Sequence, residues 1–328
     1  MSLHENLNQQ FYGKSTWIKF LIPLSYVYLL ALCIRTFFYR FGILTANKLP
    51  VPVVVIGNIT LGGTGKTPLI IAVASHLKNI GHKPGIISRG YKSKGYGSKE
   101  VTAHSKFEDV GDEPLMIKRQ LEVPVFIGKR RVETAKLMMK SYPEIDIILS
   151  DDGLQHFDLF RDYEIAVVDK SRGFGNNHLL PAGPLRESMN RLKSVDAVVM
   201  NDETSTSTDS FGMHYEPYEE IQSVNYNKSI KIKNLINKKI YAVTGIGNPE
   251  RFFSLLTNLG LIFERLVFDD HHSFSDKDFS VCGNEIIVMT EKDSVRCFNL
   301  NNKNLWYLSI KAVVDKNLLA DITKKIGL

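Results

Sequence analysis

A glycine-rich segment with a lysine is the strongest sign of chemistry in this chain. Thr60–Thr67 reads TLGGTGKT and follows an unbroken apolar run, Val53–Ile56. A buried strand that leads through such a turn into a helix is the P-loop arrangement, in which backbone N–H groups surround phosphate oxygens. The lysine brings charge to the β- and γ-phosphates, and the last threonine hydroxyl suits Mg²⁺. The predicted ATP-binding residues are Thr60, Leu61, Gly62, Gly63, Thr64, Gly65, Lys66 and Thr67.

The first position of this segment departs from the usual pattern, which opens with glycine and here has Thr60. We expect the Gly62–Gly63 pair and Gly65 to supply the flexibility instead. The alternative is a glycine-rich turn that contains a lysine by chance. The order of strand, turn and a helix from Pro68 favours the P-loop, because that helix would direct its N-terminal dipole at the phosphates.

Two consecutive aspartates, Asp151 and Asp152, follow a second apolar run, Ile145–Ser150. Open α/β sheets bind ligands at the carboxyl ends of their strands, and an acid beside a P-loop commonly binds Mg²⁺ there. The alternative is a pair of turn or cap residues. The pattern predicts a metal-binding carboxylate and leaves open which acid binds directly.

A phosphoryl transfer to an alcohol also needs a group that orients or deprotonates the acceptor hydroxyl. Asp112 lies in a Gly-Asp-Glu-Pro segment, and Asp270 precedes His271 and His272. Each has an ordinary alternative, since Asp112 could cap a helix with proline in its first turn and the histidines could lie on the surface. An Asp–His pair would suit the task, because imidazole orients a carboxylate and can hold a proton.

Apolar segments alternate with helical ones over the first two thirds of the chain. The predicted strands are 53–56, 84–88, 123–127, 145–150, 163–168 and 195–200, and the predicted helices are 68–80, 112–120 and 131–139. Continuous apolar strands separated by helices predict a parallel sheet covered on both faces. The fold class is therefore α/β, with a parallel sheet that carries the P-loop, and the family resemblance described below implies that this is a P-loop kinase core.

The remainder of the chain predicts a smaller C-terminal α/β domain. Predicted strands at 240–243, 286–289 and 305–308 accompany helices that end near Leu259 and Ile326. The Gly245-x-Gly247 turn is not a dinucleotide fingerprint, because the third glycine and the partner acid are missing. We expect four parts: a membrane-associating helix in 1–40, the kinase core in 41–205, a linker with at most short strands in 206–239, and the C-terminal domain in 240–328.

The N-terminal segment Trp17–Ile34 is almost entirely apolar and contains one charge, Lys19. As a helix it would be about 27 Å long at ~1.5 Å per residue, near the lower limit for a span of ~30 Å. A signal peptide is disfavoured because no small-residue cleavage site follows. The aromatic residues favour a helix in the membrane interface over a full span, and a buried core helix is the remaining alternative.

Composition is that of a folded protein, with 328 residues, 44% apolar and 23% charged. The net charge of +6 does not by itself imply nucleic acid, and it suits an anionic membrane or a phosphorylated substrate. Cys33, Cys282 and Cys297 lie far apart, so neither a zinc site nor a disulfide framework is indicated. We expect no nucleic-acid partner, and nothing in the sequence requires more than a monomer.

Seven motifs in a fixed order resemble the tetraacyldisaccharide 4'-kinase family, the lipid A 4'-kinases. They are Gly57–Pro68, Ser88–Tyr91, Gly111–Pro114, Asp151–His156, Leu180–Glu187, Asp270–His271 and Thr290–Asp293. The resemblance covers nearly the whole chain. It implies that the γ-phosphoryl of ATP passes to the 4'-hydroxyl of a tetraacylated glucosamine disaccharide 1-phosphate with Mg²⁺, at the cytoplasmic face of the inner membrane.

The resemblance also implies roles for single residues. The implied catalytic residues are Asp112, His271, Asp151, Asp152 and Arg131, and the implied metal residues are Thr67, Asp151 and Glu187. Asp112 pairs with His271 as acceptor base, and Arg131 lies near the γ-phosphate, although adjacent Arg130 leaves that register open. The role of His156 stays open. The basic loop 89–99 either meets the 1-phosphate of the substrate or is simply solvated.

Two other functions use the same P-loop. A P-loop switch or metallochaperone-type NTPase would hydrolyse nucleotide to change partners, but the guanine-reading Asn-Lys-x-Asp segment of a GTPase is missing. A membrane-tethered ATPase would have no acceptor. ATP turnover that depends on the lipid acceptor separates the kinase from both.

Overall fold

The structure, a computed structural model, describes residues 10–13, 17–90, 97–204 and 209–327. In this part of the chain, thirteen strands form one sheet in the order β11-β10-β12-β13-β8-β7-β6-β1-β5-β2-β4-β3, with β9 on β8. The strands are β1 Val53–Gly57, β2 Pro84–Ser88, β3 Lys99–Glu100, β4 Val125–Ile127, β5 Ile147–Asp151, β6 Tyr163–Asp169, β7 Ala197–Asn201, β8 Phe211–Ser223, β9 Ser229–Lys231, β10 Ile240–Thr244, β11 Glu264–Val267, β12 Ile286–Thr290 and β13 Leu305–Val314. The helices are α2 Ile22–Arg40, α3 Lys66–Asn79, α4 Phe107–Val110, α5 Asp112–Gln120, α6 Arg131–Ser141, α7 Pro249–Asn258, α8 Glu291–Ser294 and α9 Lys316–Ile326, with 3₁₀ helices η1 Trp17–Leu21, η2 Met189–Lys193, η3 Ile232–Leu235 and η4 Asp276–Cys282.

The first half of the sheet confirms the predicted parallel arrangement. Strand β1 lies between β5 and β6, parallel to both, so that Ile56 is in register with Asp151 and Ile165. Every residue of β1, β2 and β5 is buried. Apolar residues of α3, α5 and α9 cover one face, and those of α6 cover the other. The strands that follow β1 in the chain lie on both sides of it, with β5, β2 and β4 on one side and β6 and β7 on the other. Sheets of this kind bind ligands at the carboxyl end of the strand where the order reverses, which here is β1.

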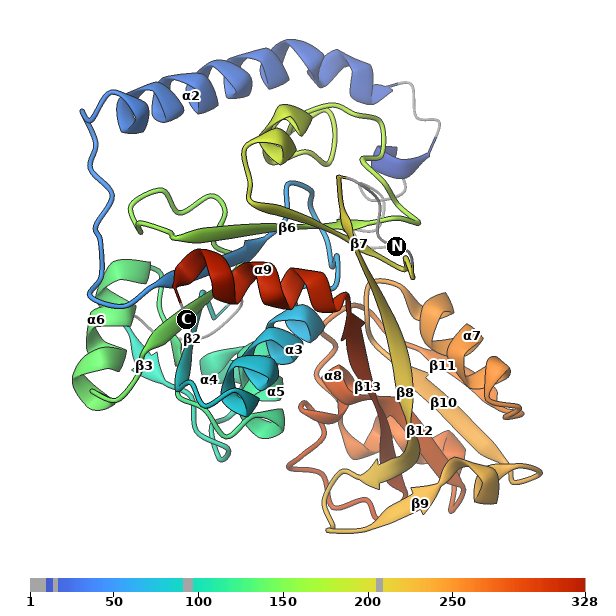
Figure 1. The fold of residues 1–328 in the computed structure, drawn as a ribbon. Coiled ribbons are helices and arrows are strands. Elements are labelled where there is room, and N and C mark those ends of the chain that lie inside the picture. Colours follow the sequence, from blue (N-terminus) through green and yellow to red (C-terminus); the bar gives the residue numbers. More distant parts are fainter. Residues whose placement is uncertain (1–9, 14–16, 91–96, 205–208, 328) are drawn as a thin grey trace.

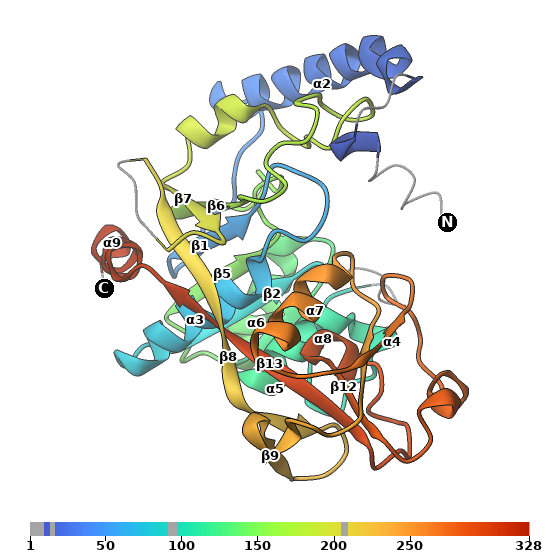
Figure 2. The ribbon, with the colours of Figure 1, turned by 90° about the vertical axis from the view of Figure 1, so that its right-hand side faces the viewer.

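The expected linker over 206–239 differs from what the structure has there. Strand β8 contains 13 residues and pairs in parallel with β7 and antiparallel with β13. Figure 2 shows β8 and β13 side by side, running from one half of the molecule to the other. The expectation of at most short strands is wrong, because the long partner β13 supplies the backbone hydrogen bonds that a polar segment needs to stay extended.

The second half is a smaller α/β unit, as expected. Strands β10, β11, β12 and β13 are parallel to one another. Phe252, Phe253 and Leu256 of α7 pack on one face of these strands, and Phe279 of η4 packs on the other. The sheet is continuous through both halves, and β8 and β13 join the two units through backbone pairing.

Helix α2 lies at the edge of the molecule, apart from the sheet layers (Figure 1). The segment Ile18–Arg40, which consists of α2 and the residues directly before it, is long and apolar enough to cross a membrane, and only 6% of its most apolar stretch is buried. The exposed apolar side chains include Phe20, Leu24, Tyr26, Val27, Leu30, Ile34, Phe37 and Phe38. This exposure is inconsistent with the core-helix alternative.

Candidate active site

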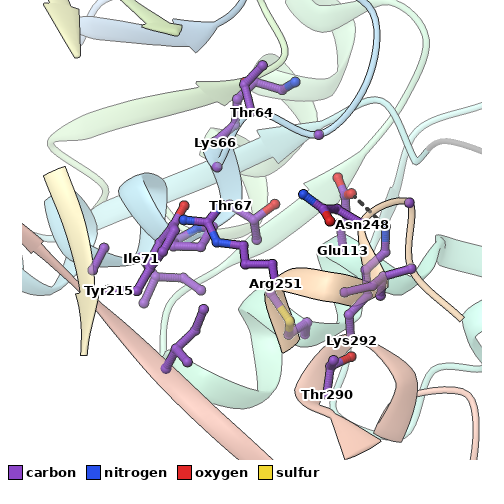
Figure 3. A pocket seen from close by; sticks show the side chains of 18 of the residues that line it. Thr64, Lys66, Thr67, Ile71, Glu113, Tyr215, Asn248, Arg251, Thr290 and Lys292 are labelled. Carbon is purple, nitrogen blue, oxygen red and sulfur yellow. Dashed lines mark hydrogen bonds and ion pairs between the residues drawn. The ribbon is translucent and has the colours of Figure 1, made fainter. Parts of the chain in front are cut away.

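A cavity of about 1890 Å³ lies at the carboxyl ends of the central strands. Its lining comes from both halves of the sheet, including the P-loop, the start of α5, α7 and α8. In Figure 3, Thr64 and Lys66 of the P-loop lie toward the top of the view, Arg251 lies near its middle and Tyr215 toward its left. Glu113 and Lys292 form an ion pair beside Asn248. The cavity therefore brings the predicted phosphate-binding loop opposite residues of the second unit.

The P-loop adopts a conformation that only glycine accepts easily at two positions. Gly62 and Gly65 have φ values of 98° and 94°, in the left-handed region. A Cβ on Gly65 would lie 2.2 Å from the hydroxyl of Tyr215 and 2.6 Å from Nδ2 of Asn201. Gly65 immediately precedes α3, whose first N–H groups face the loop. Left-handed glycines followed directly by a helix N-terminus are the backbone geometry that an anion-binding loop requires.

Lys66 is held at the cavity by polar groups from two other segments. Its Nζ donates to Oδ1 of Asn58 at 3.1 Å and lies 3.4 Å from Oδ1 of Asp152. Asp152 also pairs with Arg186 at 2.9 Å. Burial favours the neutral acid, but the charges of Lys66 and Arg186 outweigh it and hold the pKa of Asp152 well below its usual range. Asp152 is therefore an anion, and its negative charge orients the ammonium group of Lys66.

Asp151 has a different environment, although it is adjacent in the chain. Its Oδ2 accepts a hydrogen bond from Ser88 at 2.9 Å, whereas its buried Oδ1 has no hydrogen-bond partner among the described residues. Burial, followed by the charges of Glu113 and Asp152, raises the pKa of Asp151 to about 6. A buried carboxylate oxygen without a donor is what a Mg²⁺ ligand presents before the ion binds.

Asp112 and His271 are in contact, a pairing that the family resemblance implied. Nδ1 of His271 lies 2.7 Å from Oδ2 of Asp112, and Lys292 and Arg296 approach the same oxygen at 3.9 and 4.0 Å. Burial raises the pKa of Asp112, but the hydrogen bond with His271 and the nearby cations outweigh it and hold that pKa well below its usual range. Asp112 is the first residue of α5 and not its cap, since Gly111 occupies the cap position.

The two neighbouring arginines of the predicted phosphate site point to different places. Arg131 is fully buried and donates to the backbone carbonyls of Gly128 and Asp151, both at 2.8 Å. Burial lowers its pKa to about 10. Arg130 is exposed and pairs with Glu133 at 2.7 Å. Of the two, only Arg131 contacts the acid-bearing strand, and it does so beneath the cavity.

The carboxylate of Glu187, the third predicted metal residue, already contacts other side chains of the protein. Its Oε1 accepts from Nε2 of Gln155 at 2.7 Å, and its Oε2 lies 3.3 Å from Nε of Arg191. Over the ranges that the structure describes, no group of three or more His, Cys, Asp or Glu side chains is poised to hold a metal. A Mg²⁺ ion would therefore take part of its oxygen ligands from the nucleotide phosphates, as is usual for this ion.

Two other sequence candidates line the cavity. Arg89 lies on its wall, whereas residues 91–96 of the predicted basic loop lie outside the described residues. His156 also lines the cavity, and burial together with the charge of Arg131 lowers its pKa to about 4, so its ring is neutral near pH 7.

Comparison with known proteins shows the family to which this sequence is related. The sequence model of the family described as tetraacyldisaccharide-1-P 4'-kinase matches residues 17–327. This chain belongs to that family.

Individual relatives match this chain over nearly its full length. The chain is 40% identical over 321 residues to the tetraacyldisaccharide 4'-kinase of Methylobacillus flagellatus, covering 98% of this chain and 95% of the relative. It is 43% identical over 312 residues to the tetraacyldisaccharide 4'-kinase of Idiomarina loihiensis, with 93% of each covered. A crystal structure of LpxK from Aquifex aeolicus in complex with ATP matches with a TM-score of 0.82 and 29% identity, over 95% of this chain and 100% of that one.

Three lining residues of this family member carry no role that the sequence alone predicted. Lys292, within the Thr290–Asp293 motif, pairs with Glu113 at 3.2 Å and so links α8 to α5. Arg251 lies over the ring of Tyr215, 4.4 Å from its centroid. The motif could have indicated that Lys292 belongs to the site. No local sequence pattern indicated Tyr215 of β8 or Arg251 of α7.

Proposed function

We propose that this protein transfers the γ-phosphoryl group of ATP to the 4'-hydroxyl of a tetraacyldisaccharide 1-phosphate in lipid A biosynthesis. The observation that carries the proposal is the placement of the Asp112–His271 pair on the wall of the same cavity as the P-loop, in a chain of this kinase family. A nucleotide switch needs no acceptor base, so this pair favours a kinase over the P-loop NTPase alternatives.

The phosphate side of the reaction is assigned to the P-loop and the acids beside it. Lys66 and the N–H groups of the loop would bind and neutralise the phosphates, and Asp152 would hold Lys66 in place. Thr67 and Asp151 would hold Mg²⁺, which when bound neutralises charge on the β- and γ-phosphates. Arg131 would act through the Asp151 backbone, to which it donates.

Glu187 stays a predicted metal residue in this proposal. Its carboxylate now accepts from Gln155 and lies beside Arg191, so direct binding to Mg²⁺ would require Gln155 to move. Without that movement, Glu187 would support the site through Gln155, whose Nε2 also donates to the carbonyl of Asn58 at 3.1 Å.

The acceptor side is assigned to Asp112 and His271. Asp112 would accept the proton of the sugar hydroxyl as the hydroxyl oxygen bonds to the γ-phosphorus and the bond from that phosphorus to the leaving ADP breaks. His271 would orient the carboxylate and share the proton. Residues from both halves line the cavity, and the substrates that fill it would displace water, a competing acceptor. Arg89 offers a guanidinium for the 1-phosphate of the acceptor.

Helix α2 would place this site at the membrane surface. Its inner side is tied to the core along its length: the hydroxyl of Ser25 donates to Leu179 at 2.8 Å, that of Tyr28 to Arg186 at 2.8 Å, and the ring of Tyr39 packs on Phe157. A helix attached in this way supports an interfacial position over a full span, with its exposed apolar side in the lipid. The proposed location is the cytoplasmic face of the inner membrane, where ATP is present, and the proposed state is a monomer.

The decisive experiment is a mass spectrum of the glycolipid after incubation with MgATP. The proposal expects the mass of one added phosphate and ATP turnover that depends on the lipid acceptor. ATP hydrolysis without any change in the lipid would support a membrane-tethered ATPase, and preference for GTP would support a switch.

A further inference from the structure

A buried arginine–aspartate pair lies behind the Asp112–His271 pair without lining the cavity. Asp293 is fully buried, and Arg296 is 4% exposed. One Nη of Arg296 lies 2.5 Å from Oδ1 of Asp293. Burial of two charges is costly unless hydrogen bonds satisfy their remaining polar atoms, so such a pair requires an explanation.

Asp293 fixes the ends of two strands. Its Oδ2 accepts from the hydroxyls of Thr244 at 2.9 Å and Thr290 at 2.6 Å, and its Oδ1 accepts from the N–H of Gly245 at 3.0 Å. Thr244 ends β10 and Thr290 ends β12. The carboxylate thereby fixes the backbone at Thr244 and Gly245, which lies next to the turn that contains His271.

Arg296 connects that anchor to the turn itself. It donates to the carbonyl of Gly245 at 3.1 Å and to the carbonyl of His272 at 3.0 Å. The same Gly245 carbonyl accepts the N–H of His271 at 3.2 Å. The planar guanidinium thus joins the two backbone segments that flank the histidine, a task for which its fork of donors is suited and a lysine is not.

The backbone of His271 needs such support. Its φ is 67°, in the left-handed region that a residue with a Cβ enters at a cost of order 1 kcal/mol. Strained residues of this kind persist only where the surroundings determine them. The Nε atom of Arg296 is directed toward Asp112: it has no hydrogen-bond partner in the described part of the chain and lies 4.0 Å from Oδ2 of Asp112.

We propose that Arg296, anchored by Asp293, is a positioning residue that holds His271 in its strained conformation against Asp112. This inference rests on the proposed acceptor role of the Asp112–His271 pair. It predicts that Arg296 affects turnover mainly through the histidine that it positions, beyond the direct effect of its charge on Asp112.

A double-mutant cycle tests this dependence. Arg296→Met should lower kcat about 30-fold, since small displacements of a catalytic group have effects of this order, while KM for ATP changes less than about threefold. In a His271→Ala background, the same substitution should lower kcat less than about threefold, because nothing remains to be positioned. Arg296→Lys, which keeps the charge but loses the fork, should show the same coupling and serves if the methionine variant does not fold.

Tyr163→Phe is the matched control. It removes the partly buried hydrogen bond to Asp321 at the amino end of β6, the strand end opposite to the cavity. It should lower the melting temperature without changing kcat, which separates positioning from a general loss of stability. Equal losses of kcat from Arg296→Met in both backgrounds would overturn the inference alone. Near-normal turnover by His271→Ala would overturn both the inference and the proposed acceptor role.

Discussion

Nδ1 of His271 lies 2.7 Å from Oδ2 of Asp112, although 159 positions separate the two residues in the chain. Asp112 begins α5 in the first half of the sheet, and His271 belongs to a turn of the second half. The pair forms because β8 and β13 hold the two halves in one sheet. The proposed acceptor base is therefore a product of the fold as a whole.

Asp112→Asn should lower turnover of the lipid acceptor by about 10³-fold, within the range measured for loss of a general base. The amide fills the same space, so binding of MgATP should change less than about threefold. The measurements are product formation by mass spectrometry and ATP affinity by calorimetry. Turnover near that of the unaltered chain would show that another group accepts the proton.

Without ligand, the Asp151→Asn variant should be more stable than the unaltered chain, and the difference should grow as the pH rises. Because burial raises the folded-state pKa of Asp151 to about 6, the folded state binds this proton more tightly than the unfolded state. The stability that the neutral acid contributes is present below about pH 4 and is lost as the pH rises through about 6. The melting temperature of the variant should exceed that of the unaltered chain by about 2 °C at about pH 8, and by less at about pH 5.

The same Asp151 variant should lose most of the thermal stabilisation that MgATP gives the unaltered chain, because the proposed metal ligand is gone. Melting curves in EDTA and in MgATP measure both effects. A variant that gains no stability at high pH, or that MgATP still stabilises in full, would contradict this account of Asp151.

The sequence predicted the strands that carry the site better than the segments that join the two halves. β2 has the predicted bounds Pro84–Ser88, because a fully buried parallel strand is an uninterrupted apolar run between turn residues. β13 was predicted only to Leu308 and continues to Val314, where its partner is β8. Pairing between strands distant in the chain decides such segments, and a local pattern does not contain it.

The site shows the same division. The P-loop is contiguous, so its residue types and their order are sufficient to define it. The register of Arg130 and Arg131 could not be decided, because it depends on which side chain turns inward at the start of α6. Arg296 lies outside the Thr290–Asp293 motif and had no signal in the sequence, because its partners are backbone carbonyls of a distant turn.

Charges on the exposed side of α2 should release the protein from membranes. Leu30 and Ile34 are 60% and 46% exposed and lie one turn apart on that side. Replacing both with Asp should weaken binding to vesicles of phosphatidylethanolamine and phosphatidylglycerol at least about tenfold, since each buried aliphatic side chain contributes about 1.5–3 kcal/mol. Co-sedimentation measures the loss, and ATP affinity should not change.

Ile262→Asp is the control for that pair, because Ile262 is an apolar residue 75% exposed on the other unit. It should leave vesicle binding unchanged. If α2 crossed the bilayer, the unaltered chain would resist extraction by alkaline carbonate, and that result would contradict the interfacial position.

Gly65→Ala should damage the P-loop, whereas Gly63→Ala should not disturb the fold. At Gly65 a Cβ meets the Tyr215 hydroxyl at 2.2 Å, and φ is 94°. At Gly63 a Cβ meets nothing within 4 Å. The strain and overlap at Gly65 should cost about 2 kcal/mol, which lowers the melting temperature by roughly 4–6 °C, and the displaced N–H groups should weaken ATP binding at least about tenfold. Equal melting temperatures for the two variants would mean that Tyr215 and Asn201 move aside freely and that the loop is not held by β8 and β7.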